Sequence, residues 1–184
     1  MMKIKKIKSI IMILILLIIS VTTVLVVIRN KKLEQQIPYI AFGENSTRED
    51  CIFICSNGEI YAATSEEAFL MDLSETAKKI QEDDYADILE FVGTTDAKKV
   101  KRMYRLYSTV VLNEDYRVKS KKEIVPASQE YGGKVRYWYG NYYDEEGELH
   151  TICIYQSNAD KFCSDIRAYS IVRWMYNCLK DYME

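Results

Sequence analysis

Residues 51–63 read Cys-Ile-Phe-Ile-Cys-Ser-Asn-Gly-Glu-Ile-Tyr-Ala-Ala, and this stretch is the clearest β-hairpin signal in the chain. Two largely apolar runs, 51–55 and 59–63, flank the pair Asn57-Gly58. Asn-Gly accepts the positive φ angles that a tight β-hairpin turn requires. The stretch therefore predicts two antiparallel strands joined by a short turn.

A second hairpin is predicted over 134–143 and 148–156, joined by the turn Asp-Glu-Glu-Gly at 144–147. A four-residue loop would place Tyr143 opposite Glu148 and Asn141 opposite His150. One face would carry Tyr137, Tyr139, Ile152 and Ile154, and the other Trp138, Tyr142, Leu149, Cys153 and Tyr155. A sheet with one wet face alternates apolar and polar residues. Because both faces here are rich in aromatic residues, we expect this hairpin to be central or covered on both sides.

Helical patterns lie between the two hairpins and after the second. Thr64 and Glu67 form a capping box that predicts a helix with Leu70, Leu73, Ala77 and Ile80 on one stripe. A short helix over 85–92 would end at Gly93. Residues 104–112 favour a strand by their β-branched and aromatic content, with a helix over 98–107 as the alternative. Short edge strands are expected at 116–119 and 123–125.

The chain closes with a helix predicted over 159–182 that carries two apolar stripes. We expect the first to face the core: Phe162, Ile166, Tyr169, Val172, Tyr176, Leu179 and Met183. The second is either covered by a neighbouring element or exposed as an interface, including one between two copies of the chain: Ile171, Trp174, Met175, Cys178 and Tyr182. Together these patterns predict an α+β fold, an antiparallel sheet with two or three packed helices.

The N-terminal segment 9–28 contains no charged residue and consists almost entirely of Ile, Leu, Val and Met. Nineteen helical residues span roughly 28 Å, close to the hydrocarbon thickness of a bilayer. We therefore predict a transmembrane helix over 9–29, which places the chain in a lipid bilayer. The alternatives are a cleaved signal peptide and a buried core helix. The apolar run is long for a signal peptide, and it ends in Val-Leu-Val-Val-Ile-Arg without a clear cleavage site.

Flanking charges predict the orientation of this segment. Four lysines precede it, and Arg29, Lys31 and Lys32 follow it. The positive-inside rule favours a cytoplasmic N-terminus by a small margin, and a head with four lysines is costly to translocate. The predicted organisation is a basic cytoplasmic head (1–8), the transmembrane helix (9–29), a juxtamembrane linker (30–49) and an extracytoplasmic domain (50–184).

Residues 33–184 contain 18 basic and 27 acidic residues, a net charge of −9, although the whole chain carries only −2. Phosphate binding needs a basic patch, so we expect no nucleic-acid partner. The acidic surface is explained by solvation, or by attraction to a basic protein partner.

Signals for catalysis are weak. The chain has one histidine, His150, which excludes a metal site with two or more histidines. We find no phosphate loop, zinc-protease motif or nucleophile elbow, and we expect no cofactor, no metal and no catalytic residue. A thiol enzyme would have to pair Cys55 or Cys153 with His150. Five cysteines leave an odd thiol, and Cys51 and Cys55 on one strand are too far apart for a disulfide.

The best binding candidates are the aromatic residues of the second hairpin and the final helix, because Tyr and Trp offer large contact area at low entropic cost: Tyr137, Trp138, Tyr139, Tyr142, Tyr143 and Trp174. Gly140, between them, would let a ligand or backbone approach closely. The sequence thus predicts a membrane-anchored, non-catalytic protein-binding module. One form is an immunity protein that neutralises a toxin at the cell surface, and another is an accessory subunit of an envelope complex. The alternative is a tethered thiol or carboxylate hydrolase acting on envelope material.

Overall fold

The structure is a computed structural model that describes residues 2–46, 50–64, 72–110, 136–156 and 166–182. The chain divides into two compact units, Met1–Gln36 and Ile37–Glu184, which are described separately. The described elements run in the following order: α1 (Met2–Gln35), β1 (Ile40–Ser46), β2 (Asp50–Cys55), β3 (Glu59–Ala63), α3 (Leu73–Gln81), β4 (Leu89–Thr94), α4 (Ala97–Val110), β5 (Arg136–Tyr143), β6 (Leu149–Gln156), α6 (Ile166–Leu179) and a 3-10 turn (Lys180–Tyr182).

The first unit is the single helix α1. By length and composition, its segment Ile11–Gln35 is able to cross a membrane. The hydroxyls within the apolar run bond back to the helix, as expected: Ser20 Oγ donates to the Leu17 carbonyl at 2.8 Å and Thr23 Oγ1 to the Ile19 carbonyl at 2.7 Å. Thr22 Oγ1 likewise donates to the Ile18 and Ile19 carbonyls, so the hydroxyls of Ser20, Thr22 and Thr23 all have partners, as the interior of a bilayer requires.

The linker predicted over 30–49 is wrong. Helix α1 continues to Gln35, because 31–35 (Lys-Lys-Leu-Glu-Gln) are strong helix formers. Pro38 disfavours helical geometry at the residue before it and separates the helix from a strand. That strand, β1, begins at Ile40, and Ile40, Ala41 and Phe42 are fully buried.

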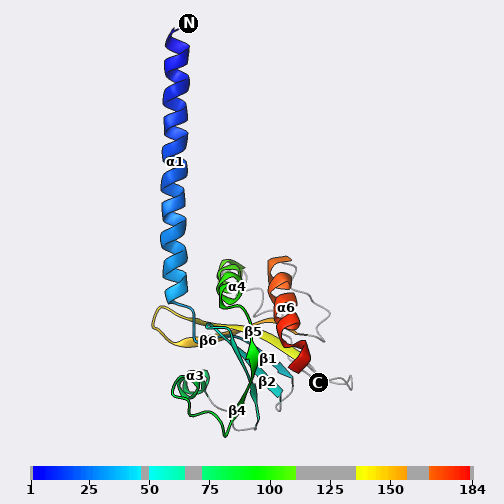
Figure 1. Cartoon of the computed structure of the whole chain (residues 1–184). Helices are drawn as coiled ribbons and strands as arrows, with labels where there is room; N and C mark the ends of the chain where they lie inside the picture. The colour runs from blue at the N-terminus through cyan, green and yellow to red at the C-terminus, as the bar shows by residue number, and fades with distance from the viewer. Residues whose placement is uncertain (1, 47–49, 65–71, 111–135, 157–165, 183–184) are drawn as a thin grey trace. The chain divides into compact units, whose positions relative to one another are not determined.

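The second unit is built on a six-stranded antiparallel sheet with the order β4-β3-β2-β1-β5-β6 (Figure 1). The α+β class with an antiparallel sheet is confirmed. Strand β1 lies inside the sheet because it pairs with β2 on one side and β5 on the other. The segment predicted as a linker therefore joins the two hairpins into one sheet.

The β2–β3 hairpin is confirmed, with Phe53 opposite Tyr61 and Ile54 opposite Ile60. Its turn is longer than the two-residue type. Residues 56–58 form the loop, the Gly58 amide donates to the Cys55 carbonyl at 2.9 Å, and only Gly58 has a positive φ, of 96°. A three-residue loop with glycine in the left-handed region is the next most common way to close a hairpin.

The β5–β6 hairpin is also confirmed, but its predicted register is wrong by one residue. Tyr143 pairs with Leu149 and Gly140 with Ile152, so five residues rather than four form the loop. An irregularity between Trp138 and Tyr139 shifts the register again. Because side chains alternate along a strand, the slip places Ile152 and Ile154 on the same face as Trp138 rather than Tyr139.

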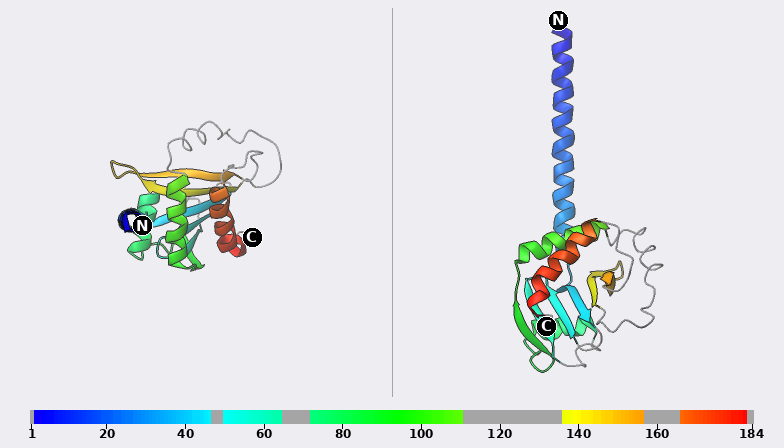
Figure 2. Two further views of the ribbon diagram at one scale, coloured as in Figure 1. Left: turned by 90° about the horizontal axis from the view of Figure 1, so that it is seen from above. Right: turned by 90° about the vertical axis from the view of Figure 1, so that its right-hand side faces the viewer.

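Two hydrophobic cores lie on opposite faces of the sheet (Figures 1 and 2). The larger lies under α4 and α6, which pack side by side. Phe42 is at its centre, with its ring edge-to-face with Tyr107 at 5.7 Å and Trp174 at 5.5 Å. The smaller core lies under α3 and contains Phe53 and Tyr61.

Two other predicted elements are corrected. Residues 89–94 form strand β4 rather than the end of a helix, and Gly93 pairs with Ile60 instead of capping. Residues 97–110 form α4, so the predicted strand is wrong over 104–110 and the alternative helix over 98–107 is confirmed; residues 111 and 112 lie outside the described residues. Its buried residues recur at spacings of three and four positions, as expected for one face of a helix: Val100, Met103, Tyr104, Tyr107 and Val110. This packing outweighs the β propensity of individual residues.

Helix α3 is present, with the predicted Ile80 buried, and Asp72 caps it by accepting from the Ser74 amide at 2.8 Å. The predicted capping pair extends into residues 65–71, which lie outside the described residues, as do the edge strands at 116–119 and 123–125.

Candidate functional site

The six aromatic binding candidates do not form one surface. Trp138 and Trp174 are buried in the larger core, and Tyr139 is buried in the smaller one, where its hydroxyl lies 3.4 Å from Cys51 Sγ. Tyr137 and Tyr142 are half-buried, and only Tyr143 is exposed. Alternation along β5 sends neighbouring rings to opposite sides of the sheet, as the two predicted faces of the hairpin imply, and a binding role for these residues stays a prediction.

The second stripe of the final helix is largely covered, which is one of its two predicted roles, whereas most of the first stripe does not face the core as predicted. In α6, Ile171, Trp174 and Met175 of the second stripe are buried against the sheet. Ile166, Tyr169 and Tyr176 of the first stripe are exposed. The exchange is not complete, because Tyr182 of the second stripe is 38% exposed and Leu179 of the first is buried. Contact between two copies of the chain through this helix stays a prediction.

The exposed stripe forms one wall of a groove between α6 and the β5–β6 hairpin, which we call the α6 groove. Its volume is about 220 Å³. It is lined by Trp138, Ile154 and Tyr155 from the sheet and by Ala168, Tyr169, Val172, Arg173 and Tyr176 from α6. Tyr169 and Tyr176 remain 51% and 50% exposed at its edge, and the Tyr176 ring lies 6.3 Å from that of Trp138. An apolar, aromatic-lined hollow with few polar groups is the usual form of a recognition site.

Arg173 is the charged group of the α6 groove. It makes no ion pair with any residue that the structure describes. The three elements that line the groove, β5, β6 and α6, contain Arg136, Arg167 and Arg173 and no acidic residue. Arg136 and Arg167 do not line the groove, so among the described residues that do line it the charge comes from Arg173.

A buried ion pair supports the sheet beside this groove. Glu44 on β1 is fully buried, and its Oε1 lies 3.2 Å from Nη1 of Arg136 on β5. Asn141, also buried, donates to the Ile40 carbonyl at 2.9 Å and accepts from Thr151 Oγ1 at 2.7 Å. These contacts position β5 between β1 and β6. The sequence contained no signal for the contacts of Arg136 with Glu44 and of Asn141 with Ile40, since these partners lie far apart along the chain.

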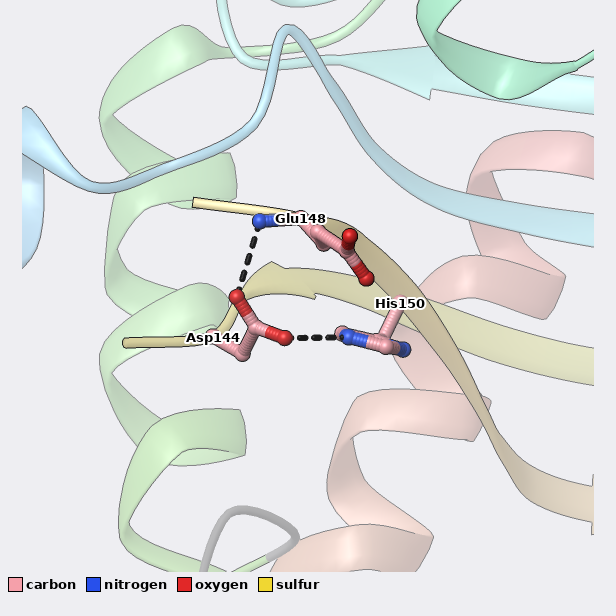
Figure 3. A group of neighbouring side chains, drawn as sticks. All are labelled: Asp144, Glu148 and His150. Carbon is pink, nitrogen blue, oxygen red and sulfur yellow. Dashed lines mark hydrogen bonds and ion pairs between the residues drawn. The ribbon is translucent and has the colours of Figure 1, made fainter. Parts of the chain in front are cut away.

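The loop of the β5–β6 hairpin brings together Asp144, Glu148 and His150 (Figure 3). Asp144 Oδ1 accepts from the Glu148 amide at 2.8 Å, and Oδ2 lies 2.6 Å from His150 Nε2. The hydrogen bond with His150 lowers the pKa of the Asp144 carboxyl. Possible ligand atoms of all three residues lie within 4.8 Å of one another. A cation would have to displace the short Asp144–His150 bond, so these contacts are best explained as closing the hairpin.

The predicted thiol–histidine pair is not formed among the described residues. His150 bonds to Asp144, whereas Cys153 Sγ lies 3.4 Å from the Tyr155 carbonyl oxygen. Burial raises the pKa of the Cys51 thiol to about 12 and also raises those of Cys55 and Cys153. The thiolate is the reactive form of cysteine, so these environments oppose nucleophilic chemistry. The described cysteines are free thiols, as the predicted strand geometry requires for Cys51 and Cys55.

Sequence reasoning missed Tyr155, Tyr169, Arg173 and Tyr176 as site residues. A signal was present: Tyr169, Arg173 and Tyr176 recur on one helical face at spacings of four and three. The stripe that contains Tyr169 and Tyr176 was assigned to the core. Because the second stripe is equally apolar, periodicity did not show which of the two stripes is buried.

Comparisons with known proteins add no functional information: no family model, no curated protein and no solved structure matches the chain.

Proposed function

We propose that the chain is a membrane-anchored, non-catalytic binding module that recognises another protein outside the cytoplasm. The observation that supports this role best is the α6 groove, in which two half-exposed tyrosines border an apolar hollow. Aromatic rings that are rigid and accessible are typical of residues that dominate the binding energy of interfaces. The apolar length of α1 supports the anchor.

Toxin neutralisation by an immunity protein is one concrete form of this role, and service as an accessory subunit of an envelope complex is another. Both require that the domain face outward, which the lysine-rich head favours. A protease added to intact cells should remove the domain. If the domain is cleaved only after lysis, it faces the cytoplasm and both forms are wrong.

The binding role is tested with the full-length chain cross-linked in its own membranes. Replacing Tyr169 and Tyr176 by alanine should weaken capture of the partner by about tenfold or more, because hot-spot aromatics carry most interface energy. The matched control is Tyr143→Ala, which removes a ring that is 46% exposed but lies outside the α6 groove.

Equal capture by the Tyr169/Tyr176 variant and the wild type would exclude the α6 groove as the binding site. Loss of capture in Tyr143→Ala alone would instead move the site to the loop of the β5–β6 hairpin. Folding of each variant is checked by circular dichroism before capture is measured.

A further inference from the structure

We infer that the exposed basic face of α4, formed by Lys98, Lys101 and Arg102, docks on anionic lipid headgroups of the bilayer in which the chain is anchored. This inference rests on the membrane attachment in the proposed function, and it concerns a different surface from the α6 groove. It assigns the basic face a partner of defined chemistry, a phospholipid surface.

Among the residues that the structure describes, the charges around α4 and those around α3 differ in sign. Helix α4 contains five basic residues and no acidic one, although residues 33–184 carry a net charge of −9. Around α3, on the opposite face of the sheet, residues 72–90 contain seven acidic residues and two lysines (Figure 2). The premise that an acidic domain lacks a basic patch is therefore wrong, since net charge says nothing about how charges are distributed.

Packing fixes the direction in which the basic residues of α4 point. The opposite side of the helix is held in the larger core by Met103, Tyr104 and Tyr107. Lys98, Lys101 and Arg102 are consequently exposed, and none makes an ion pair with a residue that the structure describes. Asp96 lies just before the helix and accepts from the Lys98 amide at 2.9 Å, so it caps the helix backbone.

An anionic bilayer is the polyanion that this chain would meet first. The tether between the predicted transmembrane segment and β1 consists of the helical residues 30–35, about 9 Å long, and residues 36–39, which span at most about 14 Å. Attraction between basic residues and anionic lipids extends over about one Debye length, roughly 8–10 Å. A tether this short keeps the surface of the domain at a high effective concentration near the headgroups.

The test measures lysine acetylation in the full-length chain reconstituted in vesicles, using a reagent that cannot cross membranes. Vesicles contain phosphatidylcholine alone or a mixture with phosphatidylglycerol. We expect acetylation of Lys98 and Lys101 to slow by about threefold or more in the anionic vesicles and to recover at high salt. Lys78 is the internal control, because it lies on α3 with a side chain that is 70% exposed.

Equal rates in the two kinds of vesicle, or equal slowing of Lys78, would overturn the inference. It would also be overturned if soluble glycerophosphate or RNA protected these lysines in neutral vesicles while phosphatidylglycerol did not. Carbonate extraction of the same vesicles separates the two failures. An inserted chain without protection refutes only the docking, whereas a chain that is washed off refutes the anchor as well.

Discussion

Among single residues, Gly140 was correctly predicted to allow a close approach, but the predicted approaching group, a ligand or backbone, was wrong. The missing side chain does allow a close approach, but the approaching group is the ring of Tyr107 in α4. A Cβ atom at position 140 would lie 2.6 Å from Tyr107 Cε2, and the Tyr107 hydroxyl donates to the Gly140 carbonyl at 2.9 Å. The glycine therefore serves helix–sheet packing.

Gly140→Ala should lower the free energy of unfolding by about 1–3 kcal/mol, because the added methyl overpacks a rigid core. Urea denaturation measures the loss. In a Tyr107→Leu background the same substitution should cost much less, since the clashing ring is gone. Strictly additive effects would show that the two residues do not interact.

Buried thiols give a second residue-scale prediction. Burial raises the pKa of Cys51 to about 12 and that of Cys55 further. Both should resist iodoacetamide at about pH 8 in the folded chain and react fully in urea, because only the thiolate is alkylated. Mass spectrometry of the labelled peptides measures this. Rapid labelling of Cys55 in the folded chain would show a reactive thiolate and would support the thiol-hydrolase alternative.

The carboxyl group of Asp144 is expected to make the stability of the fold depend on pH. Its hydrogen bond with His150 lowers the folded-state pKa below the ordinary value of 3.8. A depressed carboxyl pKa stabilises the fold above the unfolded-state pKa, and this contribution is lost as pH falls through the folded-state value. Asp144→Asn should therefore lower the melting temperature near neutral pH, with the difference from wild type shrinking below about pH 4. A difference that is constant down to the lowest measurable pH would contradict this assignment.

At the scale of elements, the final helix and the second hairpin were identified, but their orientation and register were not. Helix α6 has an apolar stripe on two sides, and periodicity shows that both exist without showing which one meets a sheet. The β5–β6 register depends on a five-residue loop in which Gly147 has a φ of 85°. The Asp144 amide donates to the Glu148 carbonyl at 3.0 Å and closes that loop. The alternation of apolar and polar side chains along a strand does not predict which hydrogen bonds close the loop.

Alanine substitutions along α6 distinguish its two stripes. Trp174→Ala should lower the free energy of unfolding by about 3–5 kcal/mol, because it opens a cavity beside Phe42. Tyr169→Ala, on the exposed stripe, should change it by about 0.5 kcal/mol or less. Chemical denaturation of both variants measures the contrast. The reverse order would mean that the predicted orientation of the helix was right after all.

At the scale of the whole molecule, the chain consists of an apolar helix and a domain with its own cores. Every residue of the two hydrophobic clusters lies at or after Ile37. We therefore expect residues 37–184 to remain soluble without detergent and to unfold cooperatively, as a domain with a complete core does. Ultracentrifugation and calorimetry of this fragment measure both properties. Aggregation of the fragment would show that α1 contributes to folding beyond anchoring.

Sequence patterns were sufficient to predict the features whose cause is local: the apolar helix, both hairpins, the final helix and the α+β class. Each depends on periodicity or turn chemistry within about twenty residues of chain. Which face of each element is buried could be read from the folded domain alone, because burial depends on the element that packs opposite. That is why Trp138 and Trp174 belong to the core, Tyr169 and Tyr176 border the α6 groove, and an acidic domain carries a basic helix.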